Sequence, residues 1–367
     1  MVDSDFILAP AVVKVEFAIQ PVINALESMQ LLNESHRLSG LGEWVTQTAA
    51  TLPAERMRQN LLVFEGLEPF VPSLLRKQHP DFPSYVDDLA AQDPTRLVAE
   101  IGHDIELITS LYPELWTEGK RVPTFDELLA DRDVFINFME TISQGDCADP
   151  TIWDEAHALY NNPPALVETI VSHLRWMWDE TLAAEWERVL PLLQESVAAF
   201  QKIDYRDMTA YEAIRAVTGR DIRSFVEKHL QRTDTLLFIP SAHIGPYVGK
   251  ISGPTGFCLV FGARLPRGAQ ATSSALSRSE LLIRLNALAD DTRLRILELM
   301  TQHEELCAQD IIERLGVSQS TVSRHLSQLS ATGYITERRR EVSKCYSLNT
   351  DRVVDTLRAL TNFLSRQ

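Results

Sequence analysis

The stretch LGVSQSTVSRHLSQLSATGYI, Leu315 to Ile335, constrains the fold of this chain more than any other stretch of the sequence. Gly316 ends one amphipathic segment, and Ser318 belongs to the residue types that cap helix N-termini. Beyond the serine, apolar residues recur at helical spacing: Val322, Leu326 and Leu329. A helix, a short glycine-containing turn and a serine-capped helix are typical of a helix-turn-helix unit.

The opposite face of the second helix carries short or flexible polar groups and no acidic residue. Hydroxyls and amides bond to phosphates and to base edges, and an arginine such as Arg324 can fork onto guanine. His325 adjoins the apolar face, where a structural or phosphate-contacting role is expected. The alternative is a solvated face without a ligand. We expect DNA contacts from Ser318, Gln319, Ser320, Thr321, Ser323, Arg324, His325 and Gln328.

A basic hairpin is predicted after Gly333. Two β-type runs, YIT at 334–336 and CYSL at 345–348, bracket a tip rich in arginine. Cations on such a wing lie along a phosphate backbone, although arginine runs can also be merely solvated. The residues expected to contact phosphates are Arg338, Arg339, Arg340 and Lys344.

The helices that flank this unit predict a second surface. One apolar face lies near Leu281, and Asp290 or Asp291 is a plausible N-cap for the helix that follows it. A narrow apolar stripe runs through the last segment, 351–364, and a stripe of this kind at a chain end tends to pack against another surface. The candidate dimerisation residues are Leu281, Leu285, Val353, Leu357, Leu360 and Leu364.

The segment ALADDTRLRILELM (287–300), the HTH core and the RRRE–Tyr346 wing together resemble the ArsR/SmtB-type winged helix-turn-helix regulators. The resemblance covers nearly all of residues 280–367. It implies a homodimer joined through its first and last helices, which binds double-stranded DNA at an inverted-repeat operator. It also implies a repressor that an effector releases from DNA.

Cys307 is a weak candidate for a metal ligand. Glu305-Leu306-Cys307 matches the start of the metal box in thiolate-type members of that family, but Gln309 stands where the second thiolate would fall. Soft metals need two or three converging thiolates, so no metal site and no cofactor are expected. A metal-sensing or thiol-redox-sensing repressor that uses Cys307 remains the alternative.

The charge of the chain divides at a linker. Residues 265–279, rich in Pro, Gly, Ser, Ala and Thr, separate residues 1–264 from a DNA-binding domain at 280–367. The formal charge is −16, but 277–367 hold 13 Lys/Arg and 12 Asp/Glu, which leaves 22 basic and 39 acidic residues upstream. The local field governs DNA binding, so the acidity of the first part does not exclude it.

Residues 1–264 are expected to form a mainly α domain with a small antiparallel β-sheet. Helical periodicity starts at Pro21, and further helices are expected over 83–89, 95–112, 124–142, 164–190 and 208–218. Alternation at 13–17 predicts a strand that pairs with a late hairpin in 234–263. WDETLAAEWERVLPLLQESV and LLFIPSAHIGPYVGKI resemble a helical domain of unknown function that precedes the winged helix in some two-part regulators.

The first 264 residues contain no HExxH, GxSxG, Walker or GxGxxG motif, so no enzyme activity is expected. We expect this part to sense a small-molecule effector or to support dimerisation. An enzyme-like domain fused to a DNA-binding module is the alternative, and a convergent His/Asp/Glu or Cys/His cluster in the first 264 residues would favour it. The four cysteines are scattered, which predicts reduced thiols, and a cytoplasmic protein without membrane contact is expected.

Overall fold

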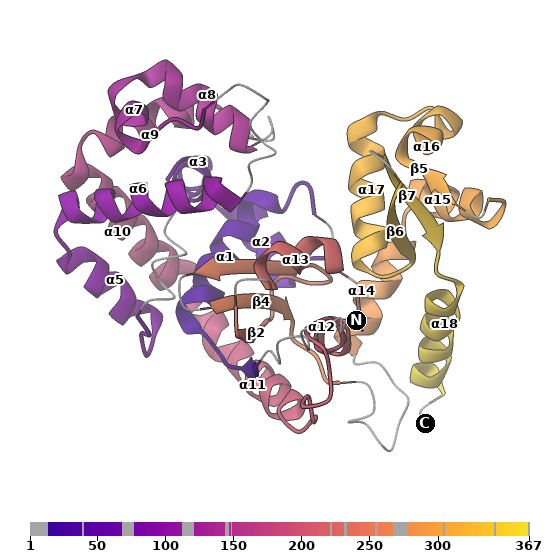
Figure 1. The fold of residues 1–367 in the computed structure, drawn as a ribbon. Coiled ribbons are helices and arrows are strands. Elements are labelled where there is room, and N and C mark those ends of the chain that lie inside the picture. Colours follow the sequence, from indigo (N-terminus) through magenta and orange to yellow (C-terminus); the bar gives the residue numbers. More distant parts are fainter. Residues whose placement is uncertain are drawn as a thin grey trace, which may run out of the picture.

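The structure is a computed structural model of the 367-residue chain. It describes residues 14–38, 40–67, 77–111, 121–143, 147, 149–220, 222–230, 233–253, 256–266, 278–303, 305–340 and 343–365. Two bodies are seen in Figure 1: an N-terminal domain (described residues up to 266) and a winged-helix domain (described residues from 278). The chain is mainly α with small sheets, as its sequence predicts.

The N-terminal domain is built mostly from helices. Pro21 starts α1, in agreement with the preference of proline for the first helical turn. The expected helix over 124–142 is two helices, since Asp131 interrupts it, and Pro191 lies inside α11 instead of ending a helix. The helices are α1 Pro21–Glu34, α2 Glu43–Thr51, α3 Ala54–Leu61, η1 Leu62–Gly66, α5 Phe82–Ala91, α6 Pro94–Leu111, α7 Phe125–Ala130, α8 Arg132–Ser143, α9 Ile152–Tyr160, α10 Pro163–Met177, η3 Trp178–Leu182, α11 Ala183–Phe200, α12 Ala210–Thr218 and α13 Arg223–Leu230.

A four-stranded sheet in the order β1-β2-β4-β3 crosses this domain. Its strands are β1 Lys14–Phe17, β2 Thr235–Ser241, β3 Val248–Gly253 and β4 Gly256–Gly262. The predicted hairpin is present as the antiparallel pair β3–β4, but the first strand pairs with β2, which precedes the hairpin, and not with the hairpin itself. The predicted antiparallel sheet is also wrong, because β1–β2 and β2–β4 are parallel. The reason is that β4, not β3, lies beside β2, so the hairpin returns the chain in the direction of β2.

Both faces of this sheet are buried. Leu236, Phe238 and Phe257 pack with residues of α11, α12 and α13 in one core. Their neighbours on the opposite face, Ile239 and Cys258, pack into a larger core with the remaining helices. Because side chains alternate between faces, a strand with both faces buried is apolar throughout, as in LLFI and GFCLVFG.

The winged-helix domain has its own core, in which Ile296, Val322, Leu326 and Tyr334 are buried. Helix α14 starts at Arg278, two residues before the predicted domain boundary, and the expected linker falls largely in 267–277, outside the described residues. The elements are α14 Arg278–Leu288, α15 Asp291–Thr301, β5 Leu306–Cys307, α16 Ala308–Leu315, α17 Gln319–Ala331, β6 Ile335–Arg340, β7 Ser343–Leu348 and α18 Thr350–Leu364.

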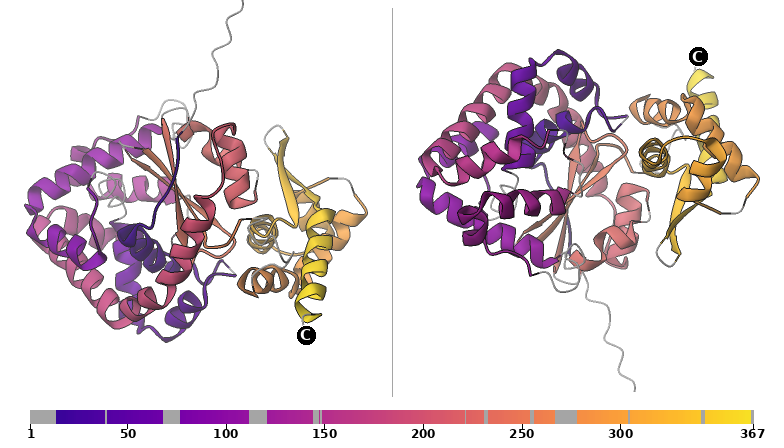
Figure 2. Two further views of the ribbon diagram at one scale, coloured as in Figure 1. Left: turned by 90° about the horizontal axis from the view of Figure 1, so that it is seen from below. Right: turned by 90° about the horizontal axis from the view of Figure 1, so that it is seen from above.

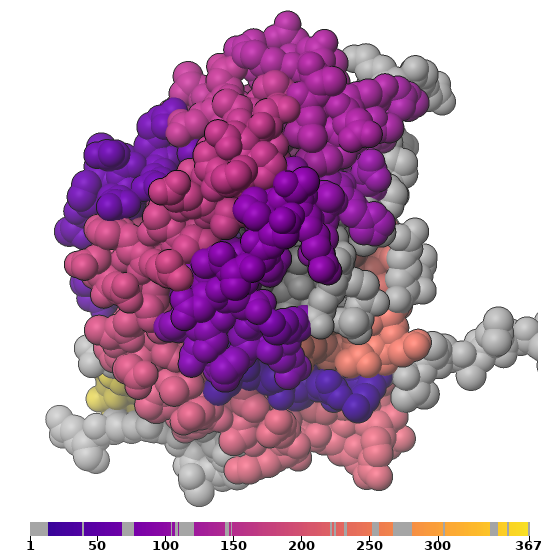
Figure 3. Space-filling view, turned by 90° about the vertical axis from the view of Figure 1, so that its left-hand side faces the viewer, coloured from indigo at the N-terminus to yellow at the C-terminus, as the bar shows by residue number. Residues whose placement is uncertain are grey.

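The two domains lie side by side, and both views of Figure 2 place α17 at the side that faces the N-terminal domain. Figure 3 views the molecule from the left-hand side of Figure 1, where the N-terminal domain covers most of the surface. Within the described part of the chain, no helix has the length and apolar character to cross a bilayer.

Candidate nucleic-acid interface

The helix-turn-helix is set by three local features. Gly316 adopts a left-handed conformation (φ 68°) and its N–H donates to the Ile312 carbonyl at 2.9 Å, which ends α16. Ser318 then accepts the N–H of Thr321 at 3.3 Å and starts α17. Asp290 caps α15 in the same way, by accepting the N–H of Arg293 at 2.9 Å. The predicted stop and the two predicted caps are therefore confirmed.

The N-terminal half of α17 presents a polar surface to solvent. Its exposed members are what we call the reading face: Gln319, Ser320, Ser323 and Arg324. Ser318 is also exposed, whereas Thr321 is half-buried. These side chains hold donors and acceptors without a negative charge, so a phosphate or base edge meets no electrostatic repulsion from the helix itself.

Two predicted contact residues of α17 are buried instead. Gln328 accepts a hydrogen bond at 2.5 Å from the guanidinium of Arg293, which also donates to the carbonyls of Asn286 and Ala287. His325 lies 3.6 Å from the Asp290 carboxylate, and burial lowers its pKa although Asp290 opposes that shift. In this arrangement neither side chain is available to DNA. Sequence spacing placed Gln328 on the polar side and His325 beside the apolar face, and the packing of α15 against α17 covers both side chains.

The predicted wing is an antiparallel hairpin of β6 and β7, which is joined at its other edge by β5. Lys344 is exposed and forms a 3.0 Å ion pair with Glu337 on the facing strand. The backbone of 338–340 belongs to β6, while the side chains of Arg338, Arg339 and Arg340 lie outside what the structure describes.

Helices α14 and α18 pack together and expose an apolar surface. Leu357 and Leu364 are 53% and 68% exposed, so these two predicted dimerisation residues lie on the surface. Leu281 is buried, and Leu285, Val353 and Leu360 are half-buried; of these, Val353 packs against the core of the winged-helix domain. The sequence prediction missed three further exposed apolar residues on these two helices: Leu282 on α14, and Val354 and Phe363 on α18.

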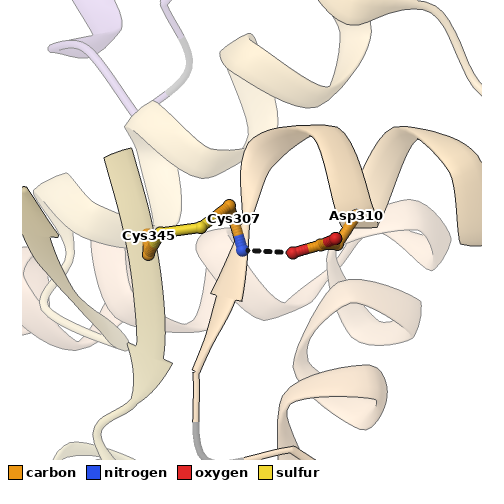
Figure 4. The surroundings of a disulfide bond; sticks show 3 residues. All are labelled: Cys307, Asp310 and Cys345. Atoms are coloured by element: carbon orange, nitrogen blue, oxygen red, sulfur yellow. Dashed lines mark hydrogen bonds between the residues drawn. A yellow bond between two sulfur atoms is a disulfide. The ribbon is translucent and has the colours of Figure 1, made fainter. Parts of the chain in front are cut away.

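The expectation of reduced thiols throughout is wrong, because Cys307 and Cys345 form a disulfide (Figure 4). Strand β5 pairs antiparallel with β7 and sets these residues opposite each other, although 38 positions separate them in the chain. The Cys307 N–H donates to Asp310 at 2.9 Å. A sulfur in a disulfide is not a thiolate, and the described residues hold no cluster of three or more His, Cys, Asp or Glu that could bind a metal.

A buried polar chain crosses the N-terminal domain. His243 lies 2.7 Å from the Ser28 hydroxyl through Nδ1 and 2.9 Å from Glu185 through Nε2, and the Trp44 ring stacks on it. Burial alone would raise the pKa of Glu185, but hydrogen bonds from His243 and Arg188 lower it to about 2. Sequence reasoning missed this group because its members come from α1, α11 and the loop after β2; the SAHIGP turn was the one visible signal.

These groups converge as a nucleophile, a base and an orienting carboxylate do, but their placement does not suit nucleophilic catalysis. Ser28 is 2% exposed and its hydroxyl also lies 2.6 Å from the Asn24 carbonyl of its own helix. A substrate cannot reach an oxygen that the helix and the imidazole enclose. Next to Ser28, burial raises the pKa of Glu27 to about 8, opposed by a hydrogen bond with Ser241.

Comparison with known proteins covers the winged-helix domain. Residues 290–337 match the family model described as bacterial regulatory protein, arsR family. The transcriptional repressor SdpR of Bacillus subtilis is 32% identical over 80 residues, which are 22% of this chain and 88% of that protein. A probable mercury resistance operon repressor of Streptomyces lividans is 42% identical over 69 residues, 19% of this chain and only 54% of its own length. Among solved structures, NolR from Sinorhizobium fredii shares 33% identity over 23% of this chain and 83% of its own, with a TM-score of 0.20.

Proposed function

Because this chain belongs to the arsR family of bacterial regulatory proteins, we propose that it is a dimeric transcriptional repressor whose two winged helices bind an inverted-repeat operator in double-stranded DNA. The observation that carries the proposal is the exposed, acid-free reading face on a correctly capped second helix of a helix-turn-helix. Two relatives are named as repressors, which favours repression over activation. The site of action is the cytoplasm, where such DNA is found.

Each predicted contact has a role in this proposal. Gln319, Ser320, Ser323 and Arg324 read base edges from the first turns of α17, while Ser318 and Thr321 bind phosphates near its N-terminus. Lys344 and the three wing arginines neutralise phosphates along the flanking backbone. His325 and Gln328 are buried and hold α17 against α15 through Asp290 and Arg293, respectively.

The exposed surface of α14 and α18 is the proposed dimer interface. Large apolar side chains gathered on one surface rarely face water in a monomer. An isologous pairing places two recognition helices on one side of the dimer, about 34 Å apart for half-sites one turn apart.

The proposal is tested with an operator selected from a random duplex library by the full chain. Arg324→Ala is expected to cost about 1–3 kcal/mol on the selected sequence and to reduce discrimination against mutated half-sites. Alanine at 338–340 is expected to weaken binding to all duplexes and to lower the slope of log K against log salt by about one per arginine. Arg96→Ala, at an exposed cation on α6 of the N-terminal domain, is the control. A chain that selects no sequence, or wing variants with unchanged salt dependence, would refute the proposal.

The signal that releases DNA is proposed to enter through the N-terminal domain. This domain makes up most of the chain and has two cores of its own, more structure than dimerisation of the small domain requires. A small-molecule effector is the proposed class of signal. Thermal-shift screening of the full chain against metabolite sets tests it, and a domain that only supports dimerisation predicts no shift from any compound.

A thiol-redox repressor is the second candidate function, and the Cys307–Cys345 disulfide favours it. The bond ties the start of α16 to wing strand β7, so its reduction would remove a covalent link between the wing and the helix-turn-helix. A dithiol reductant would break the S–S bond, transfer two electrons and two protons to give two thiols, and itself become a disulfide. DNA affinity with and without dithiothreitol, for the wild type and for Cys307→Ser, decides: affinity that is equal in both states removes this candidate.

A further inference from the structure

The two domains touch at the elements that bind DNA. A Cβ built on Gly40 would lie 4.0 Å from the carboxamide nitrogen of Gln328 on α17, and 3.5 Å from Pro246 of its own domain. Arg220, which follows α12, interacts electrostatically with Glu337 on wing strand β6 and with Tyr247. Tyr247 in turn interacts with Arg293, the partner of Gln328. We call this the docking contact: Gly40, Arg220 and Tyr247 against Arg293, Gln328 and Glu337.

The docking contact rests on a loop that packing holds in place. Gly245 has φ 62°, and a Cβ there would lie 2.0 Å from the Gly40 carbonyl oxygen, so only glycine fits between the two loops. The Gly42 N–H donates to the His243 carbonyl at 2.8 Å. His243 is itself held by Ser28 and Glu185 in the buried polar chain. The loop therefore meets α17 as a preformed surface.

A DNA duplex needs the space that this surface occupies. Gln328 follows Arg324 by four residues, so the two are neighbours on one side of α17. The major groove is about 12 Å wide and a helix with its side chains is about 10–12 Å across, so the groove edges and phosphates of a bound duplex would lie close beside α17, on the side where the N-terminal domain stands (Figure 2). Gln328 is 2% exposed between Arg293 of α15 and the Gly40 loop of the N-terminal domain, and Glu337 lies on the wing strand along which the DNA backbone would run.

The negative charge of the N-terminal domain also opposes DNA binding in the docked arrangement. The first 276 residues hold 22 basic and 39 acidic residues, and this domain lies against the side of the winged-helix domain that carries α17 (Figure 2). Phosphates that approach α17 would therefore meet a negative field as well as an obstructed groove.

We infer that the N-terminal domain docks on α17 and the wing as an autoinhibitory clamp. The two domains must separate at the docking contact before the reading face can enter the major groove of DNA. This inference rests on the proposed DNA-binding function and adds how that same site is controlled. Residues 220 and 247 act here by closing the site, without contacting DNA themselves.

The decisive variant is Arg220→Glu in the full chain, which sets like charges opposite each other at Glu337. The clamp predicts that this variant opens and binds a fluorescein-labelled 30-base-pair duplex of mixed sequence about tenfold more tightly at low salt, the gain expected if the closed state holds about nine molecules in ten. The direction is informative, because the substitution adds negative charge and would otherwise weaken binding to a polyanion. Small-angle scattering is expected to show a larger radius of gyration without DNA.

Controls keep the test specific. Arg96→Glu makes the same charge change at an exposed site on α6, and no tightening is expected from it. The double variant Arg220→Glu/Glu337→Arg restores opposite charges and is expected to bind more weakly than Arg220→Glu alone, even though it adds a cation to the wing. Tyr247→Ala opens the contact by a different change and replaces Arg220→Glu if circular dichroism shows that variant to be unfolded.

The outcomes separate the clamp from the proposed function. Salt-dependent binding of the duplex by the wild type or by an open variant supports DNA binding; its absence in all of them refutes the proposed function and, with it, the inhibitory role. If the wild type binds and the open variants bind within twofold of it, or if their radius of gyration is unchanged, the clamp is overturned and the proposed function stands.

Discussion

Glu185, in the buried polar chain, is a residue through which the stability of the N-terminal domain is expected to depend on pH. Glu185 accepts hydrogen bonds from Arg188 at 2.7 Å and lies 2.9 Å from His243 Nε2. Burial raises the pKa of Glu185 and these partners lower it; the partners prevail, and the pKa is about 2 instead of the ordinary 4.5. A depressed carboxylate pKa contributes stability above the unfolded value, and this stability is lost as the pH falls through the folded value.

Glu185→Gln is therefore expected to lower the free energy of unfolding by about 3 kcal/mol at pH 7, because it removes one partner of a buried charged group. The difference from the wild type should be complete above pH 4.5 and should shrink as the pH falls towards 2. Urea unfolding at pH 7 and pH 3 measures it, with Glu187→Gln at an exposed site of the same helix as the control. An equal loss at both pH values would contradict this account.

At the scale of the element, α14 and α18 each carry apolar residues on the side that packs in the domain and on the side that faces solvent. Leu281 and Ala359 are buried where the two helices meet the rest of the domain, while Leu357 and Leu364 face outwards. A helix that is apolar on both sides needs a second partner, and a second copy of the same surface is the simplest one.

Leu357→Glu is expected to give a monomer of 41.4 kDa where the wild type gives a dimer, because a charge would be buried without a partner in the interface. Light scattering after size exclusion at micromolar chain concentration checks the mass. Leu294→Glu, at a residue that is 51% exposed on α15, is the matched control and should leave the dimer intact. A monomeric wild type, or a dimer with both variants, would exclude this surface as the interface.

At the scale of the whole molecule, separate hydrophobic cores give each domain its own stability. Ile296 belongs to a core confined to the winged-helix domain, and Leu174 to one confined to the N-terminal domain. Between them lies the docking contact, which is polar and small compared with either core.

Thermal unfolding by calorimetry is therefore expected to show two transitions. Ile296→Ala and Leu174→Ala should each lower the midpoint temperature of one transition and leave the other nearly unchanged. The expected loss in the free energy of unfolding of the affected domain is roughly 2–5 kcal/mol, as for other buried aliphatic residues. A single transition that both variants shift together would mean that the docking contact couples the domains into one cooperative unit.

The sequence by itself determined the local features of this protein. Proline at 21, the caps at 290 and 318 and the glycine stop at 316 act on their own backbone neighbours, so residue order was enough to place these helix ends. The helix-turn-helix, the wing and the family followed from such short-range patterns.

Only the tertiary structure decided what depends on partners distant in the chain. The parallel pairing of β2 with β4, the disulfide of Cys307 with Cys345 and the meeting of Ser28, Glu185 and His243 each join segments that sequence periodicity treats separately. The burial of Gln328 was likewise decided by the tertiary structure. Helical periodicity predicts on which face of α17 this residue lies, but not which other element packs against that face. Short-range hydrogen bonds and the alternation of side chains depend only on residues that are neighbours in the sequence, whereas a contact between distant segments forms only when the chain folds.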